Sequence, residues 1–208
     1  MRKLFLMTLA LVAGIASAQQ ADQPRARTQE AAAAQGLALL QALATGKSRE
    51  VGMSSADAAR ATLGKPLEVA SVGLDALRAY KPGDDASALI RASAEAFYPV
   101  MFEGGVRSSV RVENGDGGWQ AVRVGNSALA AAVAAARRAL PSPDDPATLV
   151  QVLALNLVFV GQKDSSGWQL APVTDDASLE LKAGKVESAA AVFTRLAPIA
   201  ARQNGDPT

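Results

Sequence analysis

The chain has 208 residues, of which 49% are hydrophobic, and its 21 basic and 20 acidic side chains give a formal net charge of +1. This near-neutral balance disfavours a general nucleic-acid binder, which needs a marked basic excess to contact phosphates. Cysteine and histidine are both absent, so disulfides, thiol nucleophiles, Cys/His zinc sites and mechanisms that use imidazole as a base are excluded.

The first predicted element is a cleavable signal peptide over residues 1–18. Two basic residues precede an apolar run from Leu4 to Ile15, and Ala16-Ser17-Ala18 forms a small-x-small cleavage site. The run is too short for a stable membrane span, and the cleavage site has no cysteine for lipid attachment. We therefore expect cleavage after Ala18 and export, as a soluble protein without a lipid anchor, to the periplasm or the external medium.

Cleavage leaves about 190 residues, enough for one domain of ordinary size. The signal peptide holds two basic and no acidic residues, so 19 basic and 20 acidic side chains remain, a net charge near −1. We expect residues 19–27 to form a flexible leader, residues 28–202 to form a single α+β domain, and residues 203–208 to be a disordered tail.

The first part of this domain is predicted to be mainly helical. Residues 28–44 have apolar residues at helical spacing and are followed by Gly46. Residues 56–63 form a short helix that Ser54–Asp57 can cap and Gly64-Lys65-Pro66 ends, and Asp84 or Asp85 can cap a helix over about 86–95. The segment Leu67–Leu74 has the pattern of a strand, and Asp75–Tyr80 fits either a helical turn or an extended segment.

The middle of the chain predicts a three-stranded antiparallel meander. The strands are residues 96–103, 106–113 and 119–124, joined by a two-residue turn at Gly104-Gly105 and by a polar turn at 114–118.

The last part of the chain predicts helices on either side of further strands. A helix capped by Asn126 or Ser127 runs to Leu140. The apolar, β-branched segment 149–160 fits one long central strand that is covered on both faces. Another strand follows at 168–173, and a final helix over about 185–201 is expected to be kinked or shortened by Pro198. The fold expected from these elements is a curved, mainly antiparallel sheet of about six strands, packed against helices at both ends and in the middle of the chain.

A short motif occurs twice, as Gly118-Trp119-Gln120 and Gly167-Trp168-Gln169, each after a strand and a polar turn. One interpretation is a duplicated helix–hairpin unit with equivalent ligand surfaces. The other is that each Trp anchors a hairpin by burying a large area.

The hairpin register predicts a candidate binding surface. With a turn at Gly104-Gly105, Tyr98 opposes Arg111, and alternation along the strands places Phe97 and Val110 in the core. The opposite face then gathers arginines and aromatic rings, which suit an anionic or glycan ligand or a protein interface. The candidate binding residues are Arg107, Arg111, Arg123, Trp119 and Tyr98. The alternative is an ordinary solvated sheet face, and a single bulge would exchange the two faces.

The acidic pairs Asp84-Asp85, Asp144-Asp145 and Asp175-Asp176 lie in predicted turns or helix starts. Such pairs can bind calcium or hydrolyse glycosides, but no calcium-loop spacing is present, and helix or turn capping explains each pair. The glycine-rich segments 104–105 and 115–118 do not lead into a helix with a following Lys-Ser/Thr, so they predict hairpin turns rather than phosphate loops.

These observations favour an exported, non-enzymatic binding or accessory protein that uses an Arg/aromatic sheet face or a groove between sheet and helix. No catalytic residue, metal site or cofactor is predicted. The expected partner is a protein or a small anionic or glycan ligand in the cell envelope, with no nucleic acid and no stable membrane insertion. Two alternatives stay open: an exported hydrolase that uses carboxylates or a Ser-Lys pair, and an inhibitor or chaperone of a co-exported enzyme.

Overall fold

The computed structural model describes residues 25–203, which form an α+β fold around one sheet. The predicted signal peptide, most of the predicted leader and most of the predicted tail lie outside these residues. The sheet has nine strands in the order β5-β4-β3-β2-β6-β7-β8-β9, with β1 paired to β3. All neighbouring strands are antiparallel except β2 and β6, which are parallel. The sheet is therefore larger than the six strands expected from the sequence.

The elements in chain order are α1 (Gln29–Val51), α2 (Ser55–Ala58), β1 (Thr62–Leu63), β2 (Leu67–Val72), α3 (Leu74–Ala79), η2 (Ala86–Leu89), β3 (Ile90–Phe102), β4 (Gly105–Gly115), β5 (Gly118–Gly125), α4 (Ser127–Ala139), β6 (Thr148–Val152), η3 (Leu153–Leu155), β7 (Leu157–Asp164), β8 (Gly167–Pro172), η4 (Ala177–Leu179), β9 (Glu187–Ser188) and α5 (Ala189–Ala200).

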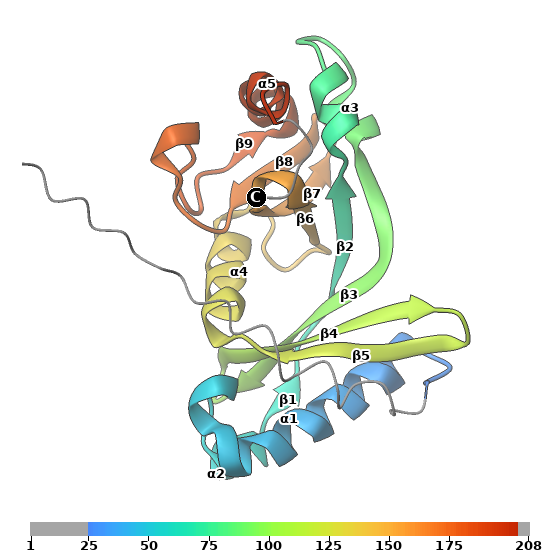
Figure 1. Ribbon diagram of the computed structural model, residues 1–208. Coiled ribbons are helices and arrows are strands. Elements are labelled where there is room, and N and C mark those ends of the chain that lie inside the picture. The colour runs from blue at the N-terminus through green and yellow to red at the C-terminus, as the bar shows by residue number, and fades with distance from the viewer. Residues whose placement is uncertain (1–24, 204–208) are drawn as a thin grey trace, which may run out of the picture.

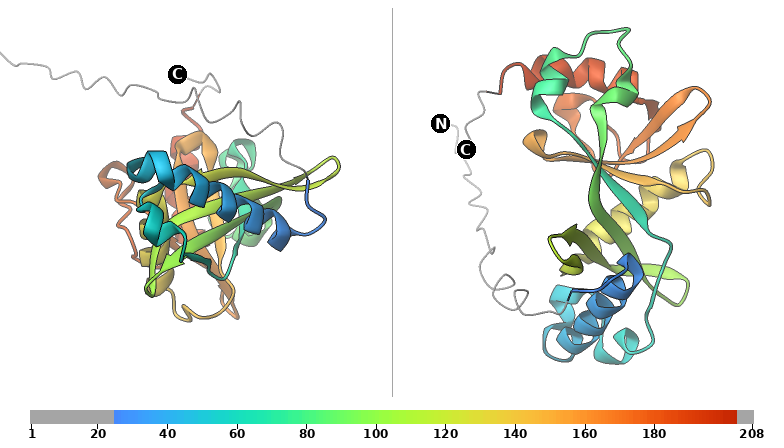
Figure 2. Two further views of the ribbon diagram at one scale, coloured as in Figure 1. Left: turned by 90° about the horizontal axis from the view of Figure 1, so that it is seen from below. Right: turned by 90° about the vertical axis from the view of Figure 1, so that its right-hand side faces the viewer.

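Three hydrophobic clusters join the helices to the sheet. The first lies between α1 and strands β3 to β5, the second surrounds α3 and α5 beside β6 to β8, and the third lies beneath α4 at the centre. Figure 1 shows α1 along the β4–β5 hairpin, α5 at the other end of the molecule and α4 between them, and the side view in Figure 2 shows β2 and β3 running between the two ends. In β3, Tyr98 faces α1 and Phe97 faces α4, because successive side chains point to opposite faces.

The first helix begins where the sequence predicts and ends later. The hydroxyl of Thr28 accepts a hydrogen bond from the Ala31 amide at 3.2 Å, which caps its first turn. Backbone angles at Lys47 are non-helical, so α1 kinks near the predicted stop at Gly46 and then continues to Val51. Gly52, with a φ of 76°, closes the helix in the left-handed conformation that glycine adopts at low cost.

Two predicted elements are wrong. The helix expected over 86–95 is a single 3₁₀ turn capped by Asp85, and β3 begins at Ile90, because Ala92 pairs with Ala70 of β2. The long strand expected over 149–160 is a hairpin: β6 and β7 pair with each other, Val150 opposite Phe159, and Asn156 turns the chain with a φ of 52°. Pairing with distant strands overrides the local pattern at both places.

Smaller differences occur at the ends of other elements. The second helix stops at Ala58, and the Thr62–Leu63 end of its predicted range forms β1. The ambiguous segment after β2 is helical, as α3. The final helix starts after its cap Ser188, and Pro198 lies inside it, two residues before its end.

The two tryptophans occupy similar places in different hairpins. Trp119 follows a two-residue turn at the start of β5 and packs against the α1 cluster. Trp168 is the second residue of β8 and lies over Gly161, where an added Cβ would be 3.1 Å from the indole ring. Both packing arrangements agree with the interpretation that each Trp anchors its hairpin.

Candidate functional site

The β3–β4 hairpin turns one residue earlier than the sequence predicts. Phe102 pairs with Gly105, so the turn is Glu103-Gly104, with φ angles of 49° and 73°. The register also shifts between Val100 and Met101, where Arg107 is an extra residue on β4. Tyr98 therefore opposes Val110, and the predicted pairing of Tyr98 with Arg111 is wrong.

This register separates the five candidate residues. Tyr98 is buried beneath α1, and Trp119 packs against the same cluster. Arg111 of β4 and Arg123 of β5 stand directly opposite each other in the strand register, on the face of the sheet opposite to α1. Arg107 lies near the β3–β4 turn, at the bulge. The predicted gathering of three arginines around aromatic rings is not present.

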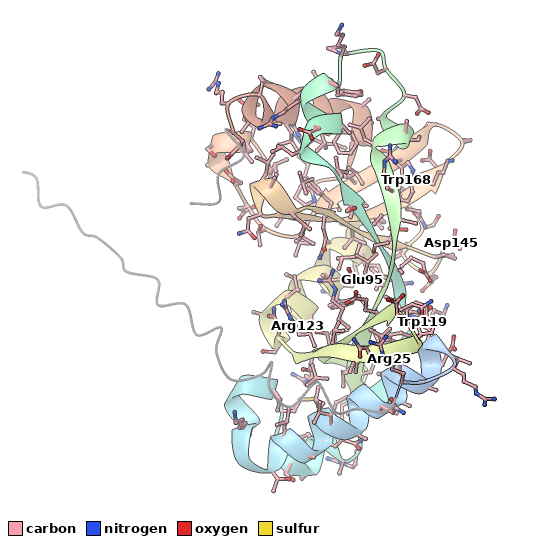
Figure 3. All side chains as sticks on the ribbon, turned by 45° about the vertical axis from the view of Figure 1, so that its right-hand side comes forward. Arg25, Glu95, Trp119, Arg123, Asp145 and Trp168 are labelled. Atoms are coloured by element: carbon pink, nitrogen blue, oxygen red, sulfur yellow. The ribbon has the colours of Figure 1, made fainter. Side chains whose placement is uncertain are left out.

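Arg111 is held by interactions within the fold. Its Nε binds the Glu95 carboxylate, and its Nη2 donates to Gln151 Oε1 at 2.9 Å. Arg123 is exposed and has no hydrogen-bond or ion-pair partner within residues 25–203. Figure 3 shows Glu95 and Arg123 on the side of the β3–β5 strands that is away from α1. A like-charged pair directly across two strands is unfavourable unless other groups compensate it, as Glu95 does for Arg111.

A surface hollow of about 580 Å³ lies where the end of α1 and the start of α2 meet the β3–β4 hairpin. We call it the hairpin hollow. It is lined by Ser48, Gly52, Met53, Ser54, Asp57, Phe102, Glu103 and Arg107.

Local packing fixes the walls of the hairpin hollow. The buried Ser108 hydroxyl donates to the Val51 carbonyl at 2.8 Å, which ties the end of α1 to β4. A Cβ atom at Gly52 would lie 2.4 Å from Ser127 Cβ and 3.1 Å from the Arg107 carbonyl, so only glycine allows this close approach. The Ser54 hydroxyl accepts from the Asp57 amide at 3.1 Å and caps α2.

The charged side chains of the hairpin hollow differ in whether they have an ion-pair partner. Asp57 is paired with Arg60 at 3.5 Å, and the Arg60 guanidinium lies 4.8 Å from the centre of the Phe102 ring. Arg107 and Glu103 are exposed, and neither has a hydrogen bond or ion pair in the described part of the chain. The hollow can therefore offer one cation, one anion and an aromatic ring to a partner.

The prediction from sequence included Arg107 and put Phe102 beside it, but missed Met53, Arg60 and Glu103. The N-terminal segment that supplies Met53 and Arg60 is remote in sequence from the hairpin, and no local pattern links the two. The triplet Glu103-Gly104-Gly105 could have indicated that Glu103 lies in the turn, because it allows a two-residue turn at either of two positions.

The acidic pairs act mainly within turns. Asp85 Oδ1 accepts from the Ser87 amide at 2.9 Å, and Asp175 Oδ1 accepts from the Ala183 amide at 2.8 Å. Asp176 binds Ser178, and this hydrogen bond lowers the pKa of the Asp176 carboxyl. Across residues 25–203, no group of three or more acidic side chains could hold a metal ion. The capping interpretation is supported for Asp84-Asp85 and Asp175-Asp176, whereas Asp144 and Asp145, in the described part of the chain, contribute only backbone atoms to the hydrogen bonds of their turn.

The fold and the hollow define an α+β protein with one nine-stranded, mostly antiparallel sheet and an open surface site at a hairpin. Comparison of the chain with protein families, curated proteins and solved structures gives no match. Within the part of the chain that the structure describes, no helix has the length and apolarity to span a membrane.

Proposed function

We propose that the protein is an exported, non-enzymatic binding or accessory protein, and that it takes an acidic group of its partner into the hairpin hollow beside Arg107. The observation that carries this proposal is the guanidinium of Arg107, which is unpaired within the described residues and which lines, together with Phe102, a hollow of about 580 Å³. Export is supported by the charged start, apolar run and cleavage pattern of residues 1–18.

The choice of Arg107 over the other predicted arginines follows from their partners. Arg111 is already compensated by Glu95 and Gln151, so a ligand would have to displace both. Arg123 is unpaired, but it lies on a sheet face rather than at the hollow. Arg107 combines an available charge with an apolar surface in the same hollow, which the half-buried Phe102 supplies.

The energetics favour joint use of charge and apolar contact. An exposed ion pair contributes only about 0.2–1 kcal/mol. Covering apolar surface contributes about 25 cal/mol per Å², so contact with the half-buried Phe102 ring can add an amount similar to that of the ion pair, whereas Met53, at 5% exposure, has little surface left to cover. The guanidinium then selects an acidic partner, and the ion pair and the apolar contact together supply the affinity.

The test is capture of the natural partner from the cell envelope. The full chain, including residues 1–18, is expressed in its native host as wild type and as Arg107→Gln. Proteins and glycans that bind to it are identified by mass spectrometry. Arg138→Gln is the matched control, because it removes an exposed arginine from α4, outside the hollow. We expect Arg107→Gln to lower the amount of captured partner by about two- to fivefold, the effect of one exposed ion pair, without a change in melting temperature.

Equal capture by the wild type and Arg107→Gln would contradict the proposed site. Turnover of peptidoglycan, glycan or ester substrates by the purified wild type would contradict a non-enzymatic role. A companion variant, Arg123→Gln, tests the face of the sheet opposite to α1. Loss of capture in this variant alone would show that the binding site lies on β5.

A further inference from the structure

The hairpin hollow is an open surface site rather than an enclosed pocket. Five of its eight lining residues are exposed, and Met53, at 5% exposure, is the buried member. Small-molecule sites usually enclose most of their ligand's surface. A free anion bound to Arg107 would remain largely in water, where an ion pair raises affinity by less than about tenfold.

The exposed residues around the hollow carry charges of both signs. Arg107 and Glu103 lie on either side of the Gly104-Gly105 peptide, and neither is paired within the described residues. A purely acidic ligand would be attracted by Arg107 and repelled by Glu103. A ligand with one acidic and one basic group, spaced to meet them, satisfies both charges.

The hollow has an apolar surface at Phe102. This ring is half-buried against the α1 cluster, and the Arg60 guanidinium lies 4.8 Å from its centre. The buried Met53 side chain also lines the hollow. Arginine, methionine and aromatic side chains are enriched at protein interfaces, where a central apolar contact is surrounded by polar groups.

From these three observations we infer that the hairpin hollow binds a protein segment in which an apolar residue lies between an acidic and a basic residue. The apolar side chain contacts the half-buried Phe102, the acidic one pairs with Arg107, and the basic one pairs with Glu103. This inference rests on the proposed function and names the class of partner for the same site.

The experiment uses a random peptide library displayed on phage and selected on the mature chain. An enriched peptide is then synthesised, and its affinity is measured by fluorescence anisotropy for the wild type, Arg107→Gln, Glu103→Gln and the control Arg138→Gln. N-acetylglutamate, sulfate and a chitin oligosaccharide are titrated in parallel by NMR, as probes for a small anion or a glycan.

We expect enriched peptides to carry the acid–apolar–base pattern, and each hollow variant to weaken the selected peptide by about two- to fivefold while Arg138→Gln does not. Neutralising the peptide's basic residue should weaken binding to the wild type but not to Glu103→Gln, which a double-mutant cycle measures as a coupling between the two groups. A coupling of zero, or peptides enriched without both charges, would overturn the inference.

The small probes separate this inference from the proposed function. Saturable binding of N-acetylglutamate, sulfate or the oligosaccharide that needs Arg107, with no enriched peptide, would leave the proposed function standing and overturn the protein-segment inference. If neither peptides nor small probes bind at the hollow, both fail.

Discussion

Arg111 of β4 donates a hydrogen bond from Nη2 to Oε1 of Gln151 in β6 at 2.9 Å, although the two residues are 40 positions apart. Gln151 is only 7% exposed, and Arg111 also pairs with Glu95 of β3. Because β3 and β2 lie between β4 and β6 in the sheet, this side chain reaches across two strands. It therefore connects the part of the sheet under α1 to the part that carries α5.

We predict that Arg111→Gln lowers the free energy of unfolding by about 1–3 kcal/mol, because it leaves the partly buried Glu95 carboxylate and the buried Gln151 amide without their partner. Urea denaturation measures the effect. Arg123→Gln removes the same charge from the paired position on β5 and should change stability by less than about 0.5 kcal/mol. Equal effects of the two changes would mean that the Arg111 contacts contribute nothing specific.

Tyr98 provides a test on the other face of the same hairpin. Its hydroxyl is buried and makes no hydrogen bond within the described residues, and burial together with the nearby Glu30 charge raises the pKa of this phenol. The nearby side chain of Gln29 opposes this rise in the pKa, but it makes no hydrogen bond with the Tyr98 hydroxyl in the structure.

Tyr98→Phe should therefore leave the free energy of unfolding unchanged or raise it by up to about 1 kcal/mol, because it removes an unsatisfied buried polar group. Thermal and urea denaturation provide the measurement, and partner capture should be unaffected. A loss of more than about 1 kcal/mol would show that the hydroxyl has a partner, such as a buried water molecule.

Local chemistry was sufficient to predict most helix starts. Thr28, Ser54 and Asn126 each cap a helix with a side-chain oxygen, as their position before an apolar pattern suggests. Such signals depend only on residues a few positions apart. The strands of the central meander were predicted for the same reason, since alternation and glycine turns are local.

The register of β3 and β4 depends on the position of the turn and on a bulge, and the alternation of apolar and polar residues determines neither. Both Glu103-Gly104 and Gly104-Gly105 can form a two-residue turn, and the chain uses the first, with Glu103 in the left-handed conformation. Arg107 then occupies a bulge. The earlier turn alone shifts the pairing by two residues and keeps the same faces, so it is the one-residue bulge that puts Tyr98 and Arg111 on opposite faces, because side chains alternate with a period of two.

The β6–β7 hairpin was missed for a different reason. Residues 149–160 are apolar almost without interruption, and such a run fits one buried strand as well as two. Asn156 is the residue that permits the turn, and the parallel pairing of β6 with β2 comes from a segment about 80 residues earlier. The sequence pattern alone held no information about that long-range contact.

Gly36 tests how closely α1 approaches the sheet. A Cβ atom at this position would lie 2.4 Å from Val110 Cγ1 and 3.0 Å from Ala121 Cβ. Alanine is a better helix former than glycine by about 1 kcal/mol, but forcing α1 away from β4 and β5 typically costs about 1–3 kcal/mol. We therefore predict a net destabilisation for Gly36→Ala, measured by urea denaturation.

The matched control is Gly46→Ala in the same helix. No atom lies within 4 Å of a Cβ placed there, and the residue is exposed. This change should stabilise the protein by about 0.4–1 kcal/mol. If both variants were stabilised, α1 could shift on the sheet without cost, and the close approach at Gly36 would not be a constraint.

Glu187 links β9 to α5 and makes stability depend on pH. Its Oε2 accepts from Arg195 Nη2 at 2.5 Å and its Oε1 from Lys185 Nζ at 3.0 Å. The hydrogen bonds from Arg195, and then from Lys185, lower the pKa of the Glu187 carboxyl from 4.5 to about 2. The folded state therefore favours the ionised carboxylate more than the unfolded chain does.

The sign of the pH effect follows from this lowered pKa. The stabilisation is fully present above the unfolded pKa of 4.5 and is lost as the pH falls through the window down to about 2. Replacing the carboxylate by an amide in Glu187→Gln should lower the free energy of unfolding by on the order of 2 kcal/mol at neutral pH, and by progressively less as the pH falls through this window. Urea midpoints measured at neutral and acidic pH test this.

Glu113→Gln, which changes an exposed carboxylate with no partner in the described range, is the control and should leave the pH profile of stability unaltered. A constant difference between Glu187→Gln and the wild type at every pH would show that the loss comes from packing of the side chain, because a titrating ion pair must disappear when its carboxylate is protonated.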